Sequence, residues 1–214
     1  TVGSLLQLEY GNTDRMAFLT LNPQITHFKS VYRKYTNFAS EFITVQPSTD
    51  NDLSWNSEQT IEFIIPTYRD SNKLMGMLYS LVNQTNENWI AHVVSDGNYT
   101  DYKEVEQHFC LNNKIKFSTI EGPNNDWGHT ARNYGLKNAT AEWVVMTGAD
   151  NYYMPDFVSE FIKVSDSDPN YNFIFCDMVH NEAHYKHYNL LEASLSEGNI
   201  DMGCFATKTK YSKR

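Results

Sequence analysis

The residues of this sequence that could do chemistry are polar side chains that directly follow apolar runs. Asp150 follows the run WVVM at residues 143–146, which is typical of a strand buried on both faces of a sheet. Asp96 follows a second run, WIAHVV. A third run, IEFII, ends just before four more candidates, which are Pro66, Thr67, Tyr68 and Arg69. Open α/β sheets bind ligands at the carboxyl ends of their strands, so we expect these residues to share one edge.

Together these side chains predict a nucleotide site. A tyrosine face can stack on a planar base, an aspartate can accept a base N–H, and an arginine can pair with phosphate through two hydrogen bonds. Taken singly, Asp96 is more simply a turn residue and Asp150 a helix cap. Their joint position after neighbouring strands favours the nucleotide site.

The elements that must position these residues alternate along the chain from residue 60 onward. The predicted strands are 61–65, 89–94, 115–120, 143–146, 172–176 and 203–207, and the predicted helices are 71–84, 102–111, 129–138 and one that opens at Pro155. This order implies parallel pairing through crossover connections. It predicts a Rossmann-like α/β/α sandwich with a central, mostly parallel sheet of about six strands.

Composition excludes some classes of partner. The chain has 214 residues, 41% of them hydrophobic, and a formal net charge of -9. Such a chain can bury one core but has no general attraction for nucleic acid or anionic membranes. No run of 18 apolar residues occurs and the three cysteines form no CxxC pair. We therefore expect a soluble, intracellular protein with no transmembrane segment and no nucleic-acid partner.

Residues 1–57 differ from the rest and predict a separate arm and linker before a domain at 58–214. Apolar and aromatic residues recur at spacings of three and four over residues 22–35, which predicts a short amphipathic helix. The string LLQLEYGNTDRMAFLTLNPQITHFKSVYRKYTNFA resembles the amino-terminal segment of the major capsid proteins of large DNA viruses. It ends before any jelly-roll strands, so the resemblance implies a docking arm. A helix that simply packs on the downstream domain is the equal alternative.

The second part of the chain resembles the family 2 glycosyltransferases, which have the GT-A fold. The resemblance rests on IEFIIPTYRDSNKLMGMLYSLVNQTNENW, on IAHVVSDGN and on GHTARNYGLKNATAEWVVMTGADNYYMPDF, and it covers residues 60–211. The ending N-x-Y-M-P-D is similar to that of spore-coat polysaccharide nucleotide-sugar transferases. With the capsid-like arm, this implies a chlorovirus enzyme that builds glycans on the viral major capsid protein.

The resemblance implies a role for each matching residue. Thr67 and Tyr68 would line the uridine pocket, Asp96 would accept the uracil N3–H, and Arg132 would lie near the base or the diphosphate. Asp150 would bind Mn²⁺ or Mg²⁺, the cations that oxygen ligands favour. The remaining residues implied in the donor site are Pro66, Arg69, Gly148 and Ala149.

The sequence departs from the family in the residues that match the family's metal-binding motif. Ala149 stands where the family commonly has an acidic residue, and Gly148 and Asn151 add no charge. The diphosphate of a UDP-sugar would then have to supply further metal ligands, as in other phosphate enzymes. The same loss motivates a rival hypothesis, a catalytically silent nucleotide-binding scaffold that docks on a capsid.

An inverting transferase needs a general base for the acceptor hydroxyl. The resemblance implies Asp201 in this role, although the family's other candidate position would lie beyond Arg214. We expect this chain to be a fragment of a longer protein. A simple loop cap is the alternative for Asp201. Glucose and deoxyhexoses such as rhamnose fit equally as the donor sugar that the resemblance implies, and the implied acceptor is a glycan or glycoprotein.

Two further hypotheses concern zinc and location. His180 and His184 flank Glu182, but the glutamate does not directly follow the first histidine as it does in zinc hydrolases, so that class is disfavoured. The viral resemblance implies the cytoplasm of the infected host cell, with virion association through the arm.

Overall fold

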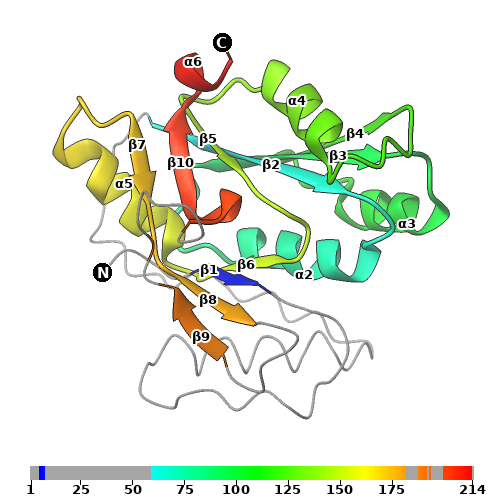
Figure 1. Cartoon of the computed structure of the whole chain (residues 1–214), viewed down its shortest axis with the longest axis horizontal. Coiled ribbons are helices and arrows are strands. Elements are labelled where there is room, and N and C mark those ends of the chain that lie inside the picture. The colour runs from blue at the N-terminus through cyan, green and yellow to red at the C-terminus, as the bar shows by residue number, and fades with distance from the viewer. Residues whose placement is uncertain (1–4, 8–58, 182–187, 192, 194–199, 214) are drawn as a thin grey trace.

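A computed structural model gives the fold of the protein and describes residues 5–7, 59–181, 188–191, 193 and 200–213. These residues form two sheets flanked by helices (Figure 1). The larger sheet has six strands in the order β4-β3-β2-β5-β10-β7. Its strands are β2 (Ile61–Thr67), β3 (Trp89–Asp96), β4 (Ile115–Ile120), β5 (Trp143–Met146), β7 (Phe173–Phe175) and β10 (Phe205–Lys208).

Strand β2 is the centre of this sheet. It pairs in parallel with β3, with Ile61 opposite Trp89, and in parallel with β5, with Ile61 also opposite Trp143. All seven of its residues are buried, as expected for a strand covered on both faces. Strand β10 runs antiparallel to both β5 and β7. The predicted mostly parallel α/β sheet is therefore confirmed, and all six of its strands match predicted ones.

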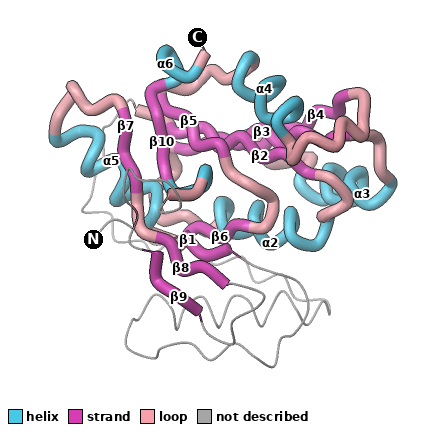
Figure 2. The backbone as a smooth tube through the Cα atoms, in the orientation of Figure 1, coloured by secondary structure: helices cyan, strands magenta, loops and turns pink. Residues whose placement is uncertain are grey.

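Helices cover both faces of the six-stranded sheet (Figure 2). Phe63 on β2 faces a core built by α2 (Ser71–Val82), α3 (Thr100–Phe109) and α5 (Phe157–Ser167). The neighbouring Ile64 points to the opposite face, where it packs with Leu136 of α4 (His129–Lys137). Successive strand residues point to opposite faces, so one apolar strand serves both layers.

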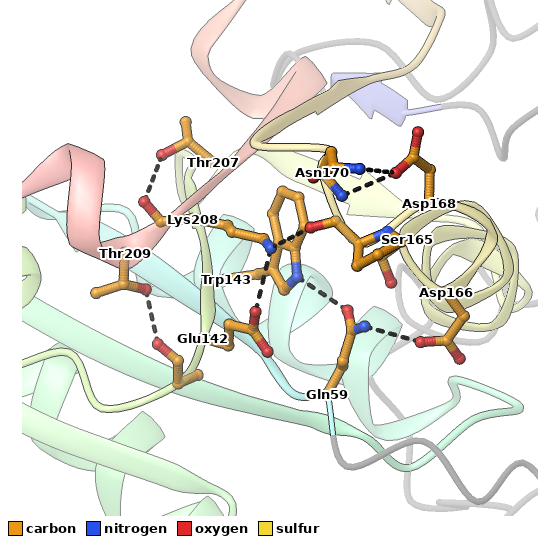
Figure 3. A network of polar contacts seen from close by, with 12 residues as sticks. Gln59, Glu142, Trp143, Ser165, Asp166, Asp168, Asn170, Thr207, Lys208 and Thr209 are labelled. Atoms are coloured by element: carbon orange, nitrogen blue, oxygen red, sulfur yellow. Dashed lines mark hydrogen bonds and ion pairs between the residues drawn. The ribbon is translucent and has the colours of Figure 1, made fainter.

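A polar network fastens the amino end of β5. The Trp143 indole N–H donates to Gln59 over 3.0 Å, and Gln59 donates to Asp166 of α5 over 2.8 Å. The Lys208 ammonium lies over the Trp143 ring and pairs with Glu142 at 3.4 Å (Figure 3). Because this end is held, the other end of β5 delivers Thr147 and Asp150 to a fixed place.

A smaller sheet, which sequence reasoning missed, has the order β6-β1-β8-β9. Its strands are β6 (Asn151–Tyr153), β1 (Leu5–Gln7), β8 (Met178–Asn181) and β9 (Tyr188–Leu191). Strand β1 pairs antiparallel with β6, with Leu6 opposite Tyr152, and parallel with β8. Residues 5–7 of the amino-terminal arm thus add a strand next to the segment that follows Asp150.

The rest of the predicted arm and linker, including the helix at 22–35, lies outside the described residues, as do Glu182 and His184 of the histidine motif. The last elements of the chain are a 3-10 turn, η2 (Met202–Cys204), and a short helix, α6 (Thr209–Ser212). Within the described ranges, no helix has the length and apolar character that a membrane span requires.

Candidate active site

Tyr68 and Arg69, which follow β2, form a cluster with Tyr99, which follows β3. Pro66 and Thr67 are buried at the end of the strand, whereas the Tyr68 side chain is 40% exposed. The Arg69 guanidinium lies 5.5 Å from the Tyr68 ring centroid and 5.1 Å from that of Tyr99, and the two rings meet edge to face at 5.4 Å. These contacts accompany a left-handed backbone at Arg69, with φ of 53°. Tyr68, the residue predicted to stack on the base, is therefore held in place by its contacts with Arg69 and Tyr99.

Asp96 ends β3 and is buried, with 5% of its surface exposed. Its carboxylate accepts the Asn124 side-chain N–H at 2.6 Å and shares the Asn124 backbone N–H at 3.2 and 3.1 Å. A Cβ on Gly122 would lie 2.3 Å from Asp96 Oδ1, so only glycine allows the loop this close. Sequence reasoning singled out Asp96 but missed Asn124, which lies 28 positions away.

The loop before α4 is fixed by Asp126 and Arg132. The Asp126 carboxylate accepts the backbone N–H of Gly128 at 3.1 Å and that of Thr130 at 2.8 Å, which caps the start of α4. Hydrogen bonding, first of all from the Thr130 hydroxyl, lowers the pKa of Asp126. Arg132 Nη1 donates to the Trp127 carbonyl oxygen over 2.8 Å. The loop that contacts Asp96 is therefore rigidly joined to α4.

Arg132 also joins α4 to the segment after β5, because its Nε donates to the Thr147 carbonyl oxygen over 3.3 Å. Burial lowers the pKa of this guanidinium, and the charges of Asp201, Asp150 and Asp126 oppose that shift, in this order. The predicted metal ligand and the predicted base thus lie within electrostatic range of one half-buried cation. A continuous set of contacts runs from Asp96 through the loop to Arg132.

Asp150 sits in the turn between β5 and β6. A Cβ on the preceding Gly148 would lie 2.6 Å from Asp150 Oδ1, so the glycine leaves space that the carboxylate occupies. The Ala149 side chain is instead buried in the core, with 5% exposed. Asp70, which follows β2, was not predicted as a site residue. Desolvation raises the pKa of its carboxyl, and the nearby charge of Asp150 raises it further.

A buried hydrogen-bond network connects the Asp150 turn with the turn at Asp201. The Asn151 side-chain N–H donates to Thr147 Oγ1 over 2.7 Å, and the Tyr153 hydroxyl lies 2.9 Å from the same oxygen. The Tyr153 hydroxyl also donates to the Gly203 carbonyl oxygen over 3.1 Å. Sequence reasoning missed this network because its members lie up to 56 positions apart.

Asp201 is the amino-terminal cap of η2, because its Oδ1 accepts the Gly203 backbone N–H at 2.9 Å. The cap leaves the second carboxylate oxygen for another partner, and the charge lies within range of Arg132. The structure therefore places Asp201 both as a turn cap and beside the predicted site.

The residue set fits a cation that also takes ligands from a phosphate. Within the described residues, no group of three or more His, Cys, Asp or Glu side chains is arranged to hold a metal ion. One or two carboxylates together with nucleotide phosphates can hold a hard cation, and Asp150 would be one such carboxylate.

The family model described as "Glycosyl transferase family 2" matches residues 62–206, which include most of β2, the loop at Asp96, Arg132, Asp150 and Asp201. The chain belongs to this family. This confirms the resemblance seen in the sequence, and with it the transferase class.

The curated glycosyltransferases that this chain resembles are distant from it in sequence. An uncharacterized glycosyltransferase of Haemophilus influenzae is 26% identical over 123 residues, which cover 56% of this chain and 40% of the relative. An uncharacterized glycosyltransferase of Rickettsia conorii is 25% identical over 187 residues, which cover 86% of this chain and 28% of the relative. The matched regions thus span less than half of each of these relatives.

A solved structure, that of S. aureus TarS 1-349, has the same fold as this family 2 chain. The TM-score is 0.60 at 17% identity, over 72% of this chain and 48% of TarS. The complex of TarS 1-349 with UDP-GlcNAc matches with a TM-score of 0.57 at 19% identity, over 72% of this chain and 47% of TarS. At these identities the likeness concerns the fold alone, and it confirms the predicted GT-A architecture.

A separate match concerns 42 residues of the chain. Over these residues the chain is 62% identical to the major capsid protein of Paramecium bursaria Chlorella virus 1. The matched segment makes up 19% of this chain and 9% of the capsid protein.

Proposed function

We propose that this family 2 chain carries the donor site of a metal-dependent glycosyltransferase that moves a sugar from a UDP-sugar to a glycan acceptor with inversion. The observation that carries the proposal is the position of Arg132: its half-buried guanidinium donates to the Thr147 carbonyl oxygen after β5 and lies within electrostatic range of both Asp150 and Asp201. Two carboxylates beside one cation at the carboxyl edge of the sheet suit a site where a diphosphate leaves and a hydroxyl is activated.

Each residue then has a role in the reaction. Tyr68 stacks on the uracil, Asp96 accepts its N3–H, and Arg132 faces the diphosphate. Asp150 would hold Mn²⁺ or Mg²⁺, and the cation would neutralise charge on the leaving UDP. Asp201 takes the proton of the acceptor hydroxyl. At the same time the acceptor oxygen bonds to the anomeric carbon of the sugar, and the bond from that carbon to UDP breaks.

The donor and the biological setting are also part of the proposal. The likeness to a UDP-GlcNAc complex supports a uridine donor. We propose glucose or a deoxyhexose such as rhamnose as the sugar. The 42-residue match to a viral capsid protein supports a glycan of the major capsid protein as acceptor, in the cytoplasm of the infected host cell and with virion association through the arm.

A silent nucleotide-binding scaffold is the second candidate, favoured by the buried Ala149 in place of an acidic residue. Release of UDP from UDP-glucose, UDP-rhamnose and UDP-GlcNAc, with Mn²⁺ and with EDTA, separates the two. We expect Mn²⁺-dependent release from at least one donor. Tight UDP binding without turnover of any donor, with or without capsid glycopeptide as acceptor, would identify the scaffold.

A further inference from the structure

Asn124 holds the carboxylate of Asp96 from one side. Its Nδ2 donates one hydrogen to Asp96 Oδ1 over 2.6 Å and the other to the Glu121 carbonyl oxygen over 2.8 Å. A flipped amide would aim its own oxygen at these two acceptors, so the hydrogen-bond network assigns its orientation. The side chain is therefore a fixed donor to Oδ1.

The two oxygens of Asp96 differ in their surroundings. Oδ1 accepts from Asn124 twice, and the backbone of Gly122 packs so close that a Cβ there would lie 2.3 Å away. Within the described part of the chain, Oδ2 receives only the Asn124 backbone N–H, at 3.1 Å, and shares that hydrogen with Oδ1. A carboxylate oxygen accepts two hydrogen bonds, so Oδ1 is filled and Oδ2 keeps one acceptor position.

Nucleobases differ in how many neighbouring N–H groups they present to a carboxylate. Guanine presents N1–H and N2–H side by side, which match the two oxygens of a carboxylate. Uracil presents N3–H alone, between two carbonyl oxygens. A carboxylate with one open position pairs fully with uracil but leaves one guanine N–H unpaired, and an unpaired buried donor weakens binding.

We propose that Asn124 is a specificity-determining residue that restricts Asp96 to a single N–H donor, so that the site selects uridine over guanosine diphosphates. Asn124 does this by filling Oδ1 from within the protein, while Gly122 lets the loop close over that oxygen. The inference rests on the proposed function, because it requires that the base of the donor reaches Asp96.

The test is calorimetric titration of UDP and GDP, each with Mn²⁺, into the wild-type chain, Asn124→Ala and a matched control, Asn138→Ala. Asn138 is an exposed asparagine that caps the far end of α4. We expect the wild type to prefer UDP. In Asn124→Ala the ratio of the GDP and UDP dissociation constants falls by about tenfold, the effect of one hydrogen-bond position on a charged group. Asn138→Ala keeps the wild-type ratio.

The other outcomes separate this inference from the proposed function. A wild type that binds UDP but not more tightly than GDP overturns the inference alone, as does an unchanged ratio in Asn124→Ala. Failure of the wild type to bind UDP overturns the proposed function. Asn124→Ser, which keeps the backbone N–H and some polarity, replaces Asn124→Ala if that variant does not fold. Loss of both nucleotides in a folded variant shows a role in loop structure and also overturns the inference.

Discussion

The Tyr153 hydroxyl donates a hydrogen bond to the Gly203 carbonyl oxygen over 3.1 Å, which joins the strand after Asp150 to the turn that Asp201 caps. The Tyr153 side chain is fully buried, and burial raises the pKa of its phenol well above the ordinary value. The hydroxyl therefore stays protonated and serves as a permanent donor. This contact links the elements that carry two carboxylates 51 positions apart in the sequence.

Tyr153→Phe removes this contact and leaves the Gly203 carbonyl oxygen without that donor. We expect a loss of about 1–2 kcal/mol in the free energy of unfolding, measured by urea denaturation. We also expect a lower kcat for UDP release with little change in KM, because Asp201 is repositioned and the donor site is not. Tyr171→Phe, at a side chain that is 43% exposed, is the control. A normal kcat in a destabilised Tyr153→Phe would limit the residue to a structural role.

Asp150→Asn keeps the shape of the side chain and removes its charge. Since Asp150 is the proposed metal ligand, the extra UDP affinity that Mn²⁺ adds should fall by at least about tenfold in calorimetry, the lower range for even indirect metal partners. Asp168→Asn, whose side chain contacts Asn170 after α5, should behave as the wild type. Equal Mn²⁺ dependence in Asp150→Asn and the wild type would exclude Asp150 as the ligand.

Asp201→Asn separates capping from catalysis. The asparagine oxygen can still accept the Gly203 N–H, so the turn and UDP affinity should stay as they are. The amide cannot take a proton, so the transfer rate should fall by about 10²–10⁴-fold, the usual contribution of a general base. The measurement is single-turnover transfer to a glycan acceptor. A near-normal rate would leave Asp201 only its role as a cap.

His92 predicts how stability changes with pH. The side chain is 1% exposed, its Nε2 lies 2.8 Å from Ser118 Oγ, and burial, with Lys116 nearby, lowers its pKa to about 4. The unfolded histidine binds a proton near its ordinary pKa of 6.5, so only the unfolded state is protonated between these values. Stability is thus unaffected by His92 above pH 6.5 and declines as pH falls toward 4.

His92→Gln should remove this decline. Between pH 7 and pH 4.5 the wild type should lose about 2 kcal/mol more than the variant in the free energy of unfolding, because each pKa unit corresponds to about 1.4 kcal/mol. His129→Gln, at an exposed position at the start of α4, should keep the wild-type pH dependence. Parallel pH profiles for the wild type and His92→Gln would show that His92 takes up its proton in the folded state at its ordinary pKa.

Local patterns determined the larger sheet. Each of its strands is a short apolar run that has to be buried, and the helices between them leave only crossover connections, so type and order follow from the sequence. The short strands β6, β8 and β9 carry no such pattern. Strand β1, from the far end of the chain, joins β6 to the β8–β9 pair, so this part of the register is set by long-range contacts.

The sequence by itself determined which residues end the strands, and hence Tyr68, Asp96 and Asp150 as candidates, because backbone periodicity is local. Only the tertiary structure decided that Asn124 fills one oxygen of Asp96, that Arg132 lies near both Asp150 and Asp201, and that Tyr153 joins their turns. These relations depend on loop paths and on burial. Hydrogen bonds and charges act through space, so their partners cannot be derived from spacing along the chain.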